Sequence, residues 1–186
     1  MKYLIVGLGN VGDEYRHTRH NIGFDILDAL AGASNVSFND KRYGNVAAAA
    51  YRGRKLVLVK PSTYVNLSGK AVNYWLQKES IPIENLLVVV DDIALPFGTF
   101  RLRANGSDGG HNGLANINTL LGTQQYARLR FGIGDEFPTG AQVDYVLGEW
   151  TAEEKSQLKP KLDTAVEIIR SFVTAGVQET MNRYNR

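Results

Sequence analysis

The opening segment of the chain constrains its fold more than any other stretch. An apolar, β-branched-rich run from Tyr3 to Val6 predicts a buried strand. Three glycines follow this run with the spacing G-x-G-x-x-G: Gly7, Gly9 and Gly12. In a dinucleotide-binding unit this pattern turns a strand into a helix beneath a pyrophosphate. The same glycines could instead shape a loop that aims Asn10, His20 and Asn21 into a cleft.

The residues around the glycines argue against a dinucleotide site. Such a site needs a helix with an apolar stripe that begins inside the motif, and an acidic residue about 20 positions later at the end of a second strand. Here Gly12 is followed by a polar segment in which Asp13 and Glu14 would repel a pyrophosphate. Asp25 and Asp28 fall inside a predicted helix instead of at a strand end. We therefore interpret the glycines as elements of loop geometry.

Length and composition narrow the possible classes of protein. A chain of 186 residues suits one compact domain with a single core, so we predict one domain over residues 1–186. The absence of cysteine excludes disulfides and zinc–thiolate sites. No apolar run approaches the ~20 residues that a membrane span needs. The sequence enters a strand at once, without a basic leader, so we expect a cytoplasmic protein with no membrane association.

Predicted strands and helices alternate along the chain. Strands are expected at 3–6, 43–51, 55–60, 86–90, 100–103 and 128–134. Helices are expected at 21–31, from about 70 to 78, at 114–121 and from 151 to 176, with Pro160 splitting the last one. The segment 135–142 is expected to be a polar loop. This alternation predicts an α/β fold, a single-domain three-layer sandwich with a mixed, mostly parallel twisted sheet flanked by helices.

Amides, imidazoles and carboxylates gather beside glycines or at the ends of predicted strands. They are Asn10, His20 with Asn21, Asn66, Asp91 with Asp92, and His111 with Asn112. In an open α/β sheet the carboxyl ends of parallel strands converge on one edge, where ligands bind. A histidine can take a proton from water near neutral pH, and a carboxylate can fix its tautomer. Asparagine amides can hold a carbonyl group and a developing oxyanion. The pattern favours a hydrolytic site.

Each of these residues also has a purely structural interpretation. Asn10 could be a turn residue, and Asn66 could cap the following helix. The two aspartates could form a turn, while His20 and the His111–Asn112 pair could each open a helix. A metal site is disfavoured because His17 and His20 lack a third ligand at a familiar spacing. A serine triad is disfavoured because the G-x-S-x-G elbow is absent. The residues alone indicate a candidate hydrolase.

Two arginine pairs suggest a local basic patch. Arg101 and Arg103 lie two residues apart, as do Arg128 and Arg130. Alternate residues of a strand share a face, so each pair would project two guanidinium groups to one side. Such an array suits phosphate. Because the formal net charge is only +2, the patch would attract a nucleic-acid end instead of a long duplex. The alternative is a solvated strand face paired with carboxylates.

Five motifs together resemble the bacterial peptidyl-tRNA hydrolase family. They run over Leu4–Phe24, Lys60–Gly69, Asp91–Gly98, Gly109–Leu114 and Arg128–Gly134, and they keep the order and spacing of the family across nearly the whole chain. Two positions depart from the family pattern. Val11 stands where the family usually has proline, and Val65 stands where it usually has methionine. Neither departure removes a polar group of the site.

The resemblance implies hydrolysis of the ester that joins a peptide to the 3′ end of tRNA, which recycles prematurely released peptidyl-tRNA. By this resemblance His20 is the base that activates water, and Asp91 orients it. Peptide and terminal nucleotide would be bound by Asn10, Tyr15, Tyr64, Asn66 and Asn112. The tRNA phosphate would be held by Arg101, Arg103 and Arg130. Arg128 is added to this set from strand geometry alone.

The resemblance further implies that the enzyme needs no metal or organic cofactor and works as a monomer without an obligate protein partner. An alternative from another class is a non-catalytic RNA-binding relative, similar to the plant organelle splicing cofactors that share the fold. Such a protein should carry a transit segment and an exposed apolar surface for its partner.

Overall fold

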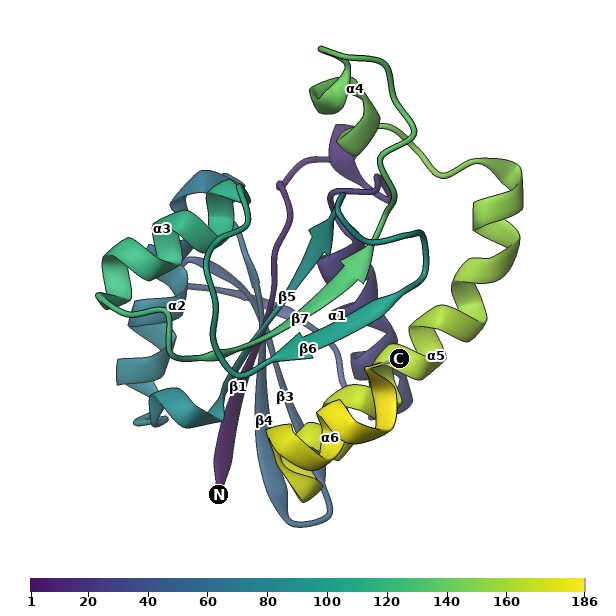
Figure 1. Ribbon diagram of the computed structural model, residues 1–186. Helices are drawn as coiled ribbons and strands as arrows, with labels where there is room; N and C mark the ends of the chain where they lie inside the picture. The colour runs from purple at the N-terminus through teal and green to yellow at the C-terminus, as the bar shows by residue number, and fades with distance from the viewer. Residues whose placement is uncertain (186) are drawn as a thin grey trace.

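A seven-stranded mixed sheet lies between two layers of helices in the computed structural model, which describes residues 1–185 (Figure 1). The strand order is β2-β3-β4-β1-β5-β7-β6. The strands are β1 (Lys2–Gly7), β2 (Asn39–Lys41), β3 (Gly44–Tyr51), β4 (Arg54–Pro61), β5 (Leu86–Asp92), β6 (Phe100–Arg103) and β7 (Ala127–Gly132). The four central strands, β4, β1, β5 and β7, run parallel, and antiparallel pairings occur toward both edges. The predicted three-layer α/β sandwich is confirmed.

Helices cover both faces of the sheet. They are α1 (Ile22–Ala33), α2 (Ser68–Lys78), α3 (Asn112–Leu121), α4 (Gln142–Val146), α5 (Ala152–Ala175) and α6 (Val177–Tyr184). Three short 3-10 turns are η1 (Asp13–Tyr15), η2 (Val65–Leu67) and η3 (Ile83–Asn85). Helices α1 and α5 pack on one face, α2 and α3 pack on the other, and α6 lies beside β6 (Figure 1). None of the helices in this described part is long and apolar enough to cross a membrane.

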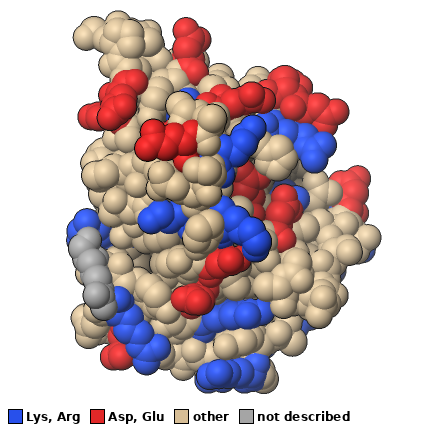
Figure 2. Space-filling model, turned by 90° about the vertical axis from the view of Figure 1, so that its right-hand side faces the viewer, with Lys and Arg blue, Asp and Glu red and all other residues tan. Residues whose placement is uncertain are grey.

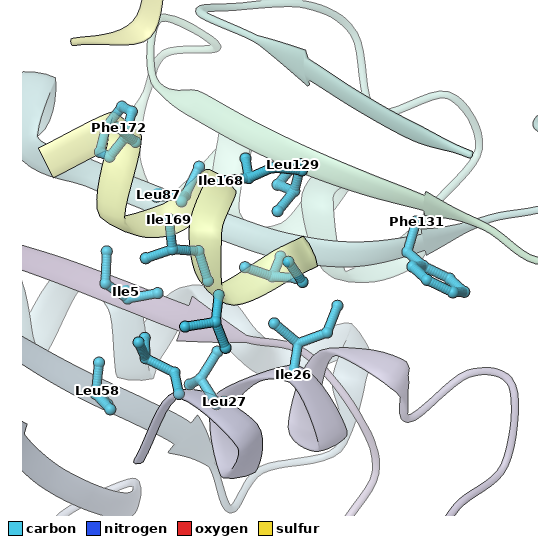
Figure 3. Close-up of a cluster of buried hydrophobic side chains, with 14 of the residues drawn as sticks. Ile5, Ile26, Leu27, Leu58, Leu87, Leu129, Phe131, Ile168, Ile169 and Phe172 are labelled. Atoms are coloured by element: carbon cyan, nitrogen blue, oxygen red, sulfur yellow. The ribbon is translucent and has the colours of Figure 1, made fainter. Parts of the chain in front are cut away.

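The core follows from the two-residue periodicity of the strands. In β1, Ile5 points into the cluster beneath α1 and α5, whereas Leu4 and Val6 point into the cluster beneath α2 and α3. Figure 3 shows the first cluster, with sheet residues packed against both helices: Ile5, Leu58, Leu87 and Leu129 against Ile26, Leu27, Ile168, Ile169 and Phe172. Both faces of the central strands are buried, which explains their continuous apolar sequences.

Most of the predicted elements are present with boundaries shifted by a few residues. The hairpin between β3 and β4 turns at Arg52 and Gly53, whose φ angles of 48° and 82° suit a two-residue turn with positive φ. Thr151 and Glu154 form the predicted capping box at the start of α5. The expected break at Pro160 is wrong, because α5 continues through it. Pro160 lies on the exposed side of the helix, where water can satisfy the carbonyl group that loses its partner.

Candidate active site

Loops that leave the carboxyl ends of the parallel strands build one polar site. The loop after β1 is fixed by its glycines. A Cβ atom on Gly7 would overlap the carbonyl oxygen of Gly23 in the first turn of α1, so strand and helix meet through two residues without side chains. Gly12 has a φ of 116°, which L-residues rarely adopt. The glycines therefore shape a tight loop that returns the chain to His20, just before α1.

Two histidines share one buried carboxylate. Asp91, at the end of β5, is 5% exposed. Its Oδ2 lies 3.0 Å from Nδ1 of His20, and its Oδ1 lies 2.9 Å from Nε2 of His111. The two imidazole rings stack with their centroids 5.4 Å apart. Each carboxylate oxygen thus has its own imidazole, which satisfies a charge that would otherwise be costly to bury.

The second nitrogen of each ring distinguishes the two histidines. His111 is the N-cap of α3, and its Nδ1 accepts hydrogen bonds from the backbone N–H groups of Gly113 and Leu114 at 3.1 and 3.4 Å. A nitrogen that accepts these bonds carries no proton, so the proton of neutral His111 must reside on Nε2, from which it is donated to Asp91. His20 donates from Nδ1 to Asp91, and its Nε2 makes no hydrogen bond with the described residues.

The electrostatics of the cluster favour an anionic Asp91 and a proton-accepting His20. Burial lowers the pKa of His20, but the hydrogen bond and the charge of Asp91 together raise it above its usual value of 6.5. Burial raises the pKa of Asp91, but its electrostatic attraction to His111 and the hydrogen bonds from both imidazoles hold that pKa well below its usual range. Asp91 therefore stays ionised and stabilises a proton on His20.

The same three side chains resemble a metal-binding set only in their spacing. Ligand atoms of His20, Asp91 and His111 lie within 4.8 Å of one another. A metal ion would need the lone pair of Nε2 on His111, but the helix cap places the proton on that nitrogen. The cluster fits a hydrogen-bonded relay better than it fits a metal centre.

A cavity of about 440 Å³ opens beside this cluster. His20, Asp91 and His111 form one part of its wall, together with Asn112 at the start of α3 and Arg130 of β7. Apolar residues of α4 and the turn after it also line the cavity: Val143, Val146 and Leu147. The cavity thus places a candidate base, an ionised carboxylate, an amide and a guanidinium around one space that can hold a substrate.

Comparisons with known proteins identify the family. The sequence model of the family described as peptidyl-tRNA hydrolase matches residues 4–186. The chain belongs to this family. A curated peptidyl-tRNA hydrolase of Phocaeicola vulgatus is 62% identical over 186 residues, and one of Bacteroides fragilis is 61% identical; both matches cover 100% of each chain. The crystal structure of peptidyl-tRNA hydrolase from Acinetobacter baumannii superimposes with a TM-score of 0.92 at 33% identity, covering 98% of this chain and 94% of that one.

Several residues assigned from the family resemblance lie outside the cavity of His20. Asn10 lines a neighbouring cavity of about 310 Å³. Its Oδ1 accepts the backbone N–H of Val65 at 3.0 Å, and Val65 lines the cavity of His20, so the two cavities share this wall. Because the contact uses the backbone of Val65, it does not depend on the methionine that is usual in the family.

The remaining predicted substrate-binding residues lie on short 3-10 turns near the site. Tyr15 ends η1 and is half-buried. Tyr64 immediately precedes η2 and is 63% exposed, while Asn66, inside η2, is also exposed. Neither Tyr15, Tyr64 nor Asn66 is part of the wall of the His20 cavity. Asn66 does not cap α2, whose N-cap residue is Leu67.

The predicted patch of four arginines is wrong for one member. Arg128 is fully buried, and its guanidinium group donates to the carbonyl groups of Gly106, Ser107, Gln124 and Tyr126 at 2.7 to 3.3 Å. The glycine-rich loop after β6 folds over this residue and removes it from solvent. Arg128 therefore anchors the loop and is unavailable to a phosphate.

The other three arginines remain partly exposed on one face of the sheet. Arg101 lies directly opposite Arg130 in the antiparallel β6–β7 pair, so their side chains are on the same face of the sheet. Arg103 is two residues after Arg101 in β6, so its side chain is on this face as well. Arg130 also contacts Asp92 at 3.7 Å and donates to the carbonyl of Ser107 at 3.0 Å. Figure 2 shows that basic and acidic side chains are mixed on the side of the molecule that carries α5.

Two contributors to the site were not predicted. Helix α4 supplies an apolar part of the cavity wall, but the sequence analysis predicts only a polar loop at 135–142 and no helix directly after it. Arg19 is 7% exposed, and its guanidinium donates to Glu154 at 3.1 Å and to the carbonyl of Tyr145 at 3.0 Å. The backbone N–H of His20 donates to Val146 at 2.8 Å. Arg19 and His20 thus tie the loop after β1 to α4. Nothing in the segment Thr-Arg-His-Asn distinguishes a buried arginine from an exposed one, so the burial of Arg19 could not be predicted from the sequence.

Proposed function

We propose that this chain carries out the reaction that its family name describes, the hydrolysis of the ester bond between the peptide and the tRNA of peptidyl-tRNA, with His20 as general base. The enzyme would thereby recycle prematurely released peptidyl-tRNA. One observation carries the mechanism. His20 holds Asp91 through Nδ1 and leaves Nε2 without a partner from the described residues, beside a cavity of about 440 Å³.

The proposed reaction begins when Nε2 of His20 takes a proton from a water molecule. The water oxygen attacks the ester carbonyl carbon and forms a tetrahedral intermediate. The carbon–oxygen bond to the ribose of tRNA then breaks, and the imidazolium returns the proton to the leaving ribose oxygen. Asp91 stays ionised throughout, keeps the proton of neutral His20 on Nδ1 and stabilises the transient imidazolium. The products are a free tRNA and a peptide carboxylic acid, which loses its proton to solvent and becomes a carboxylate.

Uncharged amides would position the ester during this reaction. Asn112 lies on the cavity wall, where its amide can donate to the carbonyl oxygen as negative charge develops. Asn10, Tyr15, Tyr64 and Asn66 lie around the neighbouring cavity or on turns close to it, and we assign them to the peptide and the terminal nucleotide. These groups bind without adding a charge that would compete with His20.

The arginines on β6 and β7 would hold tRNA phosphate. Arg130 lines the cavity of His20, and Arg101 and Arg103 lie next to it on the adjacent strand. A phosphate placed there would gain charge-assisted hydrogen bonds from partly exposed guanidinium groups. We further propose that the chain acts as a single domain, as a monomer and in the cytoplasm.

The decisive test of this function is incubation of the purified protein with N-acetyl-Phe-tRNA, with release of N-acetyl-phenylalanine as the readout. Wild type should cleave the ester, and His20→Ala should lose cleavage while it retains the thermal unfolding transition of wild type. Binding of the tRNA without cleavage by wild type would instead favour a non-catalytic RNA-binding protein. The paired imidazoles and the names of the curated relatives support an enzymatic function over non-catalytic RNA binding.

A further inference from the structure

The order of strands places the proposed site residues along a line. Arg101 and Arg103 lie on β6 at one edge, and Arg130 lies on the adjacent β7. Asp91 is the penultimate residue of β5, and the loop with Asn10 follows β1. Next in the sheet is β4, whose penultimate residue is Lys60. The phosphate-binding arginines are therefore on one side of His20 and Asp91, while Asn10 and Lys60 are on the other.

This order gives the substrate a direction. An ester carbonyl carbon joins the peptide on one side to the ribose of tRNA on the other. If the arginines hold tRNA phosphate and the carbonyl carbon lies beside His20, the peptide must leave toward β1 and β4. The space on that side, behind the wall formed by Asn10 and Val65, is the cavity of about 310 Å³.

The neighbouring cavity has the features of a binding site for a side chain. Phe24 of α1 supplies an apolar surface, and Asp25 and Asp28 of the same helix supply carboxylates. Lys60 enters from β4 and contacts Asp28 at 2.6 Å. His17 has a φ of 59°, an unfavourable conformation for a residue with a side chain, and its Nδ1 lies 3.0 Å from Oδ1 of Asp25. Strained backbone of this kind is often kept where it serves binding.

One carboxylate of the cavity lacks a permanently basic partner. Asp13 has Arg16 at 3.9 Å, and Asp28 has Lys60. Asp25 makes a direct ion pair only with a histidine, and Lys60 adds a weaker electrostatic attraction, although the side chain of Asp25 is only 12% exposed. A buried carboxylate with incomplete charge compensation attracts a cationic group, and the methylene chain of a lysine could pack against Phe24 while its ammonium reaches Asp25.

We propose that this cavity binds the peptide residue that precedes the esterified one, and that Asp25 makes the enzyme prefer a basic residue there. The inference rests on the proposed function and adds a specificity determinant to it. Burial and, to a smaller extent, the charge of Asp28 raise the pKa of Asp25 to about 6, although His17 and Lys60 lower it in part. At pH 8 the carboxylate is therefore ionised and available to a lysine or arginine of the peptide.

The test uses four esters of the same tRNA at pH 8: N-acetyl-Phe-tRNA and N-acetyl-X-Phe-tRNA with X as Lys, Gln or Glu. Each dipeptidyl kcat/KM is divided by the value for N-acetyl-Phe-tRNA with the same enzyme, so that a general change in activity cancels. Wild type should prefer Lys to Gln by about threefold and disfavour Glu, since partly exposed ion pairs are worth such modest factors. Equal relative values for all three dipeptides would overturn the inference.

Two substitutions sharpen the test. Asp25→Asn keeps a hydrogen-bonding group for His17 and should abolish the preference for Lys. Lys60→Met removes one of the two basic side chains of the cavity, the other being Arg16, and should increase the ratio of Lys to Glu. Should Asp25→Asn fail to fold, Asp28→Asn should also reduce the preference. Unchanged ratios in these variants would contradict the assignment of the cavity, whereas failure of wild type to cleave N-acetyl-Phe-tRNA would contradict the proposed function itself.

Discussion

His20 and His111 bind the same carboxylate, yet their surroundings differ at the other ring nitrogen. Two backbone N–H groups in the first turn of α3 donate hydrogen bonds to Nδ1 of His111, so this nitrogen caps the helix. His20 is on a loop, with Nε2 free of such bonds and next to the cavity. A ring with both nitrogens engaged can orient a carboxylate, while a ring with one nitrogen free can also exchange a proton with substrate.

This difference assigns distinct roles to two chemically identical side chains. His111 supplies a fixed N–H donor that holds Asp91, and Asp91 in turn holds His20 in the tautomer that leaves Nε2 as acceptor. The loss of kcat on substitution should therefore be largest for His20, smaller for Asp91 and smaller again for His111.

The largest effect is expected for His20→Ala. Loss of a general base typically costs about 10²- to 10⁴-fold in rate, and we expect a fall of kcat in this range with little change in KM. Single-turnover cleavage of N-acetyl-Phe-tRNA measures it. The comparison of the two histidines would fail if His111→Ala reduced kcat as much as His20→Ala does.

Asp91→Asn should reduce kcat by about 10²-fold, because the amide cannot stabilise an imidazolium and does not enforce the Nδ1–H tautomer. It should also change the pH profile. The raised pKa of His20 places the acidic limb of kcat/KM above pH 6.5 in wild type. Without the charge of Asp91, the effect of burial remains, and burial lowers the pKa of His20. The acidic limb of kcat/KM should therefore move to lower pH. A pH profile with an unmoved acidic limb would show that Asp91 does not control His20.

His111→Asn should have a smaller effect, about tenfold in kcat. Asparagine is a good N-cap and should preserve α3, but its shorter side chain loses the hydrogen bond to Asp91. His111→Ala is the matched variant: it loses both contacts and should unfold more easily by about 1 kcal/mol, the typical value of a lost cap. Kinetics together with thermal unfolding separate the two effects. Equal stability of the two variants would contradict the capping role.

The smallest effect is expected for Arg130→Ala, which leaves both histidines intact. KM for peptidyl-tRNA should rise a few-fold, and the dependence of log KM on log salt should lose about one unit of slope, as expected for one lost phosphate contact. A minimal peptidyl-nucleotide ester should show neither change. Arg54→Ala, in the β3–β4 hairpin at the opposite end of β4 from Lys60, is a charge-matched control. Equal losses on both substrates would assign Arg130 to the chemistry of the site.

The sequence predicted the layers of the fold because apolar periodicity is a local property. The continuous apolar run of β5 and the stripe of α5 both survive in the structure. Three features escaped prediction because they depend on the tertiary surroundings of a residue, either on contacts with distant segments or on exposure to solvent. The burial of Arg128 depends on a loop that folds back over β7, the wall formed by α4 depends on Arg19, and the continuity of α5 depends on the solvent exposure of Pro160.

The candidate site was predictable in composition but only partly in geometry. The resemblance pointed to His20 and Asp91, and the structure brings them within hydrogen-bonding distance. The resemblance could not show that Asn10 lines a second cavity. The orientation of the Asn10 side chain depends on its hydrogen bond with the backbone of Val65, which is distant in the sequence. The resemblance also could not decide the role of His111, which depends on the backbone N–H groups at the start of α3 that donate to its Nδ1.

The most direct test of the account is a long-range ¹H–¹⁵N spectrum of the imidazole rings in the uncomplexed enzyme above pH 8, with His20→Ala and His111→Asn used for assignment. We expect His20 as the Nδ1–H tautomer with an unprotonated Nε2, and His111 as the Nε2–H tautomer. On acidification His20 should protonate with a pKa above 6.5. A His20 ring with its proton on Nε2 would contradict the assignment of this nitrogen as the base that activates water.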